Sequence, residues 1–122
     1  MTKRDIEGKE DLLALMTAFY AKATKDDVIG SKFDHIDMEE HIPRIAEFWS
    51  TIIFYKGDYK GSPFDKHVPL HLKKQDFDRW LLLFEETISE MFEGKMADEI
   101  LQRAKSIGRI FLFKIESLEK LD

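Results

Sequence analysis

The chain has 122 residues, which is enough for one domain with a hydrophobic core and too few for two. Hydrophobic residues make up 43% and charged residues 35%, so the chain is predicted to be globular rather than disordered. Its formal net charge of −5 argues against nucleic acid or an anionic membrane as a partner, because both require a basic protein surface.

Apolar residues recur at helical spacing in the N-terminal part of the chain and predict a first helix over about residues 10–24. This helix has to end before Gly30. After the connection 28–36, a second helix is capped by Asp37, with Glu40 three positions on, or begins with Pro43 as its first residue. Both alternatives put His41 at the start of a helix. An apolar stripe follows it, made of Ile45, Phe48, Trp49 and Ile52.

The stretch 57–63 is rich in Gly and Pro and predicts an internal loop. Residues 63–67 have room for only about one turn of helix, because Pro69 lacks a backbone donor and restricts its neighbour. Apolar spacing then predicts a third helix through residues 77–91, which ends near Gly94, and a fourth from about 96 to 118. Since no segment alternates like a strand, the chain is predicted to be all-α.

The candidate metal ligands are the four histidines, because the chain has no cysteine to supply a thiolate. His67 and His71 have the i, i+4 spacing of a zinc-binding helix. However, Pro69 lies between them and Val68 takes the place of a catalytic glutamate, which disfavours a zinc hydrolase. His35 is most simply a solvated loop residue. His67, just after the loop, suits a ligand to one buried metal.

Taken one at a time, the other candidates have simple structural interpretations. His41 alone is most often an exposed residue of a helix's first turn. Tyr20 on an apolar helix face is usually a core residue whose hydroxyl finds a backbone partner. Trp80 and the pair Phe48 and Trp49 would be core aromatics. Only their joint arrangement, with imidazoles on two segments that each lead into aromatics, indicates a pocket for a flat apolar molecule.

Three stretches give that arrangement its specificity: 41–44 with Phe48-Trp49, 57–63 with Lys66-His67, and 77–81 with Leu83-Phe84. Together with Phe19-Tyr20 and Phe33, they resemble the truncated haemoglobins, specifically group III, over about residues 13–113. The adjacent glycine pairs that mark the other two groups of truncated haemoglobins are missing from the chain, which agrees with group III.

The resemblance implies a fold: a single truncated-globin domain over residues 1–122, built as a two-over-two α-helical sandwich around haem b. It makes His67 the proximal iron ligand and places the ring of Phe33 on the haem face. Because His71 follows His67 closely, His71 is the alternative iron ligand. A neutral imidazole suits iron in either oxidation state, and an acceptor on its other nitrogen would set the tautomer.

The resemblance also implies which residues surround a bound ligand. Tyr20, His41 and Trp80 would be the polar distal residues. Bound oxygen carries partial negative charge, so donors at Tyr20 and Trp80 would stabilise it. The remaining haem contacts expected from the residue pattern are apolar: Ile45, Phe48, Ile52, Phe84 and, in addition, Phe111.

The expected function is reversible binding of oxygen and other diatomic ligands. The alternative is a nitric oxide dioxygenase or a peroxidase-like haem enzyme. Such an enzyme would need a separate reductase, because the chain has no flavin or nicotinamide motif. A third reading, from another class, is a haem-free helical interaction module. We expect a cytoplasmic protein, since the N-terminal residues do not resemble a signal peptide and the apolar runs are too short to span a bilayer. We also expect it to be a monomer.

Overall fold

The computed structural model of the protein describes residues 3–34, 36–54 and 73–120, with side chains up to residue 114. Within these ranges the elements are α1 (Lys9–Ala23), a 3₁₀ turn η1 (Gly30–Phe33), α2 (Met38–Phe54), α4 (Lys74–Met91) and α5 (Lys95–Lys120). The described part of the chain contains no strand. The all-α prediction is therefore confirmed.

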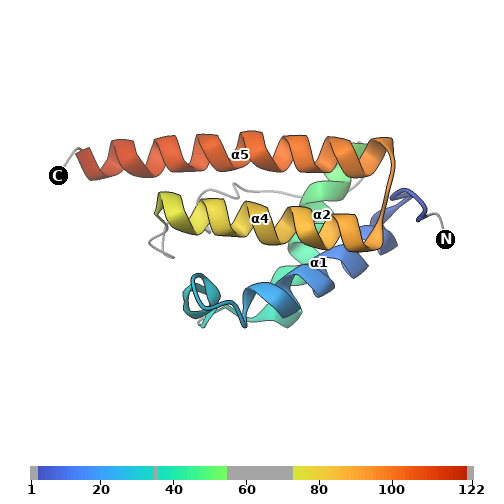
Figure 1. Ribbon diagram of the computed structural model, residues 1–122, viewed down its shortest axis with the longest axis horizontal. Coiled ribbons are helices and arrows are strands. Elements are labelled where there is room, and N and C mark those ends of the chain that lie inside the picture. The colour runs from blue at the N-terminus through green and yellow to red at the C-terminus, as the bar shows by residue number, and fades with distance from the viewer. Residues whose placement is uncertain (1–2, 35, 55–72, 121–122) are drawn as a thin grey trace.

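The helices are arranged as two pairs. α4 and α5 run side by side, and α1 and α2 pack against each other on one side of them (Figure 1). α1 also contacts α4, and α2 also contacts α5, so the two helix pairs pack against each other. This arrangement agrees with the two-over-two sandwich that the resemblance implied.

The start of α2 decides between the two predicted alternatives. The side-chain oxygen Oδ1 of Asp37 accepts a hydrogen bond from the backbone N–H of Glu39 at 3.0 Å, which satisfies a free donor at the helix N-terminus. Asp37 is therefore the cap, and Pro43 lies inside the helix rather than at its first position. The backbone N–H of His41 bonds the carbonyl of Asp37 at 2.8 Å, which places His41 in the first turn.

The N-terminal segment fixes the corner between α4 and α5. The carboxylate of Asp5 accepts hydrogen bonds from the backbone N–H groups of Met96 at 2.8 Å and Ala97 at 2.9 Å, at the N-terminus of α5. Burial alone would raise the pKa of Asp5, but these donors and that of Ile6 lower it overall. Gly94 closes the corner with a φ of 146°, where a side chain would also collide with Asp5.

The aromatic residues pack against one another at the centre of the molecule. Phe19 is fully buried and meets three rings edge-on, with centroid distances of 4.9 Å to Tyr20, 5.2 Å to Trp80 and 5.3 Å to Phe84. Edge-to-face pairs of this kind stabilise beyond the area that they bury. The core therefore links α1 directly to α4. Among the described helices, none is both long and apolar enough to cross a membrane.

Candidate functional site

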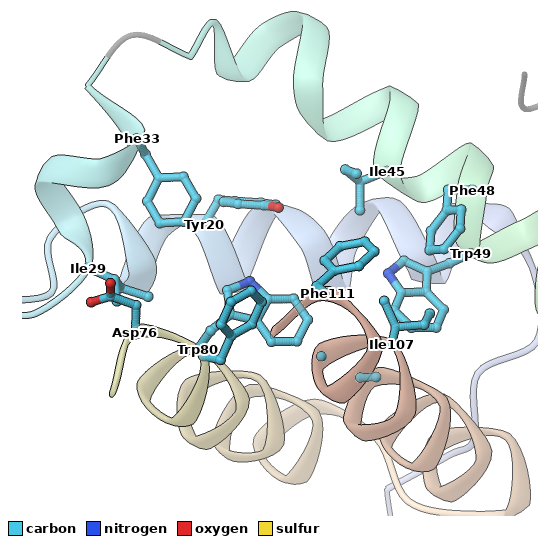
Figure 2. Close-up of a pocket in the computed structure, with 13 residues that line it drawn as sticks. Tyr20, Ile29, Phe33, Ile45, Phe48, Trp49, Asp76, Trp80, Ile107 and Phe111 are labelled. Carbon is cyan, nitrogen blue, oxygen red and sulfur yellow. The ribbon is translucent and has the colours of Figure 1, made fainter. Parts of the chain in front are cut away.

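A pocket opens between the two helix pairs, next to the aromatic core. The space between its walls amounts to about 670 Å³, part of which is open solvent. Figure 2 shows Phe33 and Tyr20 on one side of this space and Trp80 on the other. Its walls come from α1, η1, α2, α4 and α5 and consist of Tyr20, Ile29, Phe33, Ile45, Phe48, Trp49, Asp76, Phe77, Trp80, Ala104, Ile107, Gly108 and Phe111.

The chemistry of the walls suits a flat, largely apolar molecule. Among the described residues that line the pocket, side-chain polar atoms come from the hydroxyl of Tyr20, the carboxylate of Asp76 and the indole N–H groups of Trp49 and Trp80. The rest of the lining is aliphatic or aromatic. A macrocycle with an apolar body and a small polar ligand on one face fits such a lining, so the residues present are compatible with haem.

Tyr20 brings a buried hydroxyl to the pocket. The residue is 3% exposed, and its hydroxyl lies 2.9 Å from Nε2 of His41. Its ring meets Phe33 and His41 edge-on, with centroids 5.7 Å and 5.0 Å apart. Burial raises the pKa of the Tyr20 phenol, so the side chain stays neutral and keeps a proton to donate.

His41 is held beside the pocket rather than in its wall. It is half-buried in the first turn of α2 and reaches the hydroxyl of Tyr20 through Nε2, but it does not line the cavity in the described part of the chain. A neutral imidazole has one donor and one acceptor nitrogen, so this bond can run in either direction. The tautomer of His41 therefore determines whether Tyr20 donates to His41 or keeps its proton for another acceptor.

Trp80 lines the pocket from α4, and Phe84 supports it from behind. The two rings, one helical turn apart, have centroids separated by 4.9 Å. Phe84 is fully buried, and it also stacks on Trp49 at 5.9 Å. Phe84 is not one of the lining residues, but it fixes the positions of two rings that are, Trp49 and Trp80.

The sequence-predicted apolar contacts divide into two groups. Phe33, Ile45, Phe48 and the additional candidate Phe111 line the pocket, together with Tyr20 and Trp80. Phe84 and the half-buried Ile52 belong to the hydrophobic core next to it.

Several lining residues were not predicted from the sequence. Ile29 lies in a connection without periodicity, so no local signal pointed to it. Asp76 is 3% exposed; its Oδ2 accepts the backbone N–H of Lys73 at 2.8 Å and lies 4.0 Å from Nζ of Lys32. On α5 the sequence did contain a signal for the pocket. Ala104, Gly108 and Phe111 follow one another at intervals of four and three residues, so they share one helix face, and the two small residues leave space there.

The predicted iron ligand His67, the alternative His71 and the loop 57–63 lie outside the described residues. Within the described ranges, no three or more His, Asp or Glu side chains come together as a metal site. The iron ligand therefore stays a prediction from the sequence.

Comparisons with known proteins agree with the fold and the pocket. Residues 4–110 match the model of the family of bacterial-like globins. The chain is 36% identical over 111 residues to the group 3 truncated haemoglobin Ctb of Campylobacter jejuni, which covers 85% of this chain and 87% of that protein.

A solved structure gives the same result. The crystal structure of a group III truncated haemoglobin from Campylobacter jejuni superimposes with a TM-score of 0.83 at 34% sequence identity, over 93% of this chain and 95% of the other. The family match and the similarity in sequence and in fold show that the chain belongs to the bacterial-like globins and is a haem-binding group III truncated haemoglobin.

Proposed function

We propose that this globin holds haem b in the pocket and binds oxygen and other diatomic ligands there reversibly, with hydrogen bonds from the protein slowing their release. The observation that carries the proposal is the buried hydroxyl of Tyr20, which reaches a largely apolar cavity and is hydrogen-bonded to His41 at 2.9 Å. Burying a hydroxyl costs free energy unless it is hydrogen-bonded, and the bond to His41 offsets that cost. If the Tyr20 oxygen accepts that bond, the Tyr20 hydrogen can be donated to a polar ligand in the cavity.

In this proposal the macrocycle is held mainly by its apolar surface. His67 would bind the iron, and Phe33, Ile45 and Phe48 would contact the ring, with Phe84 and Ile52 supporting from the core. Each 100 Å² of ring surface removed from water would stabilise the complex by about 2.5 kcal/mol. The bound haem would supply the iron at which diatomic ligands coordinate.

Two side chains would donate hydrogen bonds to the ligand. The indole of Trp80 is a donor in every state, whereas Tyr20 can donate to the ligand only if Nε2 of His41 carries a hydrogen and donates to the Tyr20 oxygen. We therefore propose the Nε2–H tautomer of His41. Its role is to orient the Tyr20 hydroxyl toward the cavity.

The experiment that tests the function is a haem titration followed by oxygen binding. The purified protein should take up one haem per chain, show an intense Soret band, and bind oxygen reversibly in the ferrous state. A protein that stays colourless with added haem would refute the proposal. Consumption of nitric oxide or of peroxide over many turnovers with a supplied reductant, at rates far above those of free haem, would favour the enzymatic alternative.

His41 is expected to control access to the pocket, because it stands half-buried at the start of α2 beside Tyr20. Removing its side chain in His41→Ala should speed ligand entry roughly fivefold, which corresponds to about 1 kcal/mol of barrier. The spectrum of the ferrous iron should stay unchanged. Flash photolysis of the carbon monoxide complex measures the entry rate. A change from six-coordinate to five-coordinate ferrous iron in the variant would contradict a gate and show that His41 binds iron.

A further inference from the structure

One wall of the pocket is formed by the connection between α1 and α2, whose only regular element within the described residues is the short turn η1. This wall lies opposite Trp80, which belongs to α4. Ile29, just before η1, and Phe33, the last residue of η1, belong to this wall, and both are buried. Short irregular segments usually move more than the helices around them. The cavity therefore keeps its shape only if specific interactions fix the position of this wall relative to α4.

The carboxylate of Asp26 bonds both the connection that forms this wall and helix α4. Asp26, with 4% of its side chain exposed, accepts the backbone N–H groups of Val28 at 3.0 Å and Ile29 at 3.1 Å through Oδ2. Its other oxygen, Oδ1, accepts Nε of Arg79 at 2.8 Å and lies 2.6 Å from Nη2. The Arg79 guanidinium also holds the pKa of Asp26 below its ordinary value, against the opposing effect of burial.

Arg79 directly precedes Trp80 on α4, so the ion pair ties the wall to the turn of α4 that carries the proposed ligand donor. The connection itself has little slack. The backbone N–H of Gly30 bonds the carbonyl of Asp26 at 2.9 Å, and a side chain at Gly30 would meet the carbonyl oxygen of Thr24 at 2.7 Å. The Arg79 side chain is 38% exposed, so solvent screens the pair in part, but the Asp26 carboxylate that it bonds is itself covered and accepts charge-assisted bonds, which are stronger than neutral ones.

We propose that Asp26 and Arg79 are a positioning pair, which fixes the Ile29–Phe33 wall of the pocket against Trp80 and so sets how firmly a ligand is retained. Neither residue lines the cavity in the described part of the chain, so the pair acts through the wall and through α4. The effect on retention rests on the proposed function of the pocket.

The test compares haem-loaded Arg79→Gln with a matched control, Arg103→Gln. Arg103 also pairs with a carboxylate, that of Glu99 at 3.2 Å, but this pair joins two residues of the same helix, α5. Arg79→Gln should raise the oxygen dissociation rate by about two- to tenfold, which corresponds to the lower part of the range of coupling between contacting residues. Arg103→Gln should leave that rate unchanged.

A double variant shows whether the pair acts through Trp80. In the Trp80→Phe background, Arg79→Gln should add little further acceleration, because the donor that it positions is gone. Amide hydrogen exchange in the carbon monoxide complex gives a readout independent of oxygen binding. Protection at Val28 and Ile29 should fall by about tenfold in Arg79→Gln and stay unchanged in Arg103→Gln.

Two results would overturn the positioning role: full protection at Val28 and Ile29 in Arg79→Gln, or rate effects of Arg79→Gln and Trp80→Phe that multiply. If Trp80→Phe leaves oxygen release unchanged, the proposed donor role of Trp80 fails. The exchange measurement still decides in that case whether the pair fixes the wall. The two failures are therefore distinguishable.

Discussion

His67→Ala is expected to lose haem, whereas His71→Ala is expected to retain it. The imidazole of His67 follows the predicted loop 57–63 and matches the proximal ligand of the group III truncated haemoglobins. Loss of an outer partner of a metal ligand typically costs ten- to a hundredfold in affinity, so loss of the ligand itself should cost more than about a hundredfold. Haem titration of both variants, monitored by the absorbance of the Soret band, measures the difference in haem affinity.

Added imidazole sharpens this comparison. If the cavity left by His67→Ala admits free imidazole, millimolar imidazole should restore much of the lost haem affinity and return the spectrum toward that of the parent protein. His71→Ala serves as the matched histidine control, four positions away. The assignment is wrong if His71→Ala is the variant that cannot hold haem.

Tyr20→Phe is expected to release oxygen roughly ten- to a hundredfold faster than the parent protein. The substitution removes one hydroxyl from a residue that is 3% exposed and leaves the ring packed edge-on against Phe19 and Phe33. A hydrogen bond to a charged acceptor is worth roughly 1.5 to 3 kcal/mol, which gives a rate change of that size. Stopped-flow mixing of the oxygen complex with carbon monoxide measures the rate.

Carbon monoxide is the internal control for Tyr20→Phe. It is much less polar than oxygen when bound, so its dissociation rate should change far less. Equal acceleration of both gases would show a steric effect of the substitution. An unchanged oxygen rate would leave Trp80 as the sole donor and would fit a Tyr20 hydroxyl that gives its proton to Nε2 of His41.

The helices could be predicted from the sequence because their causes are local. Helical spacing of apolar residues predicted a first helix over about 10–24, and the structure has it at Lys9–Ala23. The acidic cap Asp37 and the position of Gly94 likewise act within a few residues of the helix ends that they define. The choice between Asp37 and Pro43 needed the structure, since both residues suit a helix start. The structure also starts α4 at Lys74, before the apolar spacing that begins at Phe77, and shows the turn η1 in the connection 28–36.

The walls of the pocket were predicted in part. Ile45 and Phe48 lie on the apolar stripe of α2, and the resemblance to a known family supplied Phe33 and Trp80. Ile29 and Asp76 gave no such signal, because one lies in an irregular connection and the other is a charged residue near a helix start. Their burial depends on what packs against them rather than on their neighbours in the chain.

The sequence by itself determined an all-α chain, the approximate extent of its helices, and the set of aromatic and histidine residues that marks a group III truncated haemoglobin. The tertiary structure alone decided which side chains meet. The Tyr20–His41 bond joins residues 21 positions apart, and the Asp26–Arg79 pair joins residues 53 positions apart. Helix formation depends on contacts within one or two turns, whereas these bonds exist only once α1, α2 and α4 have packed around a common core.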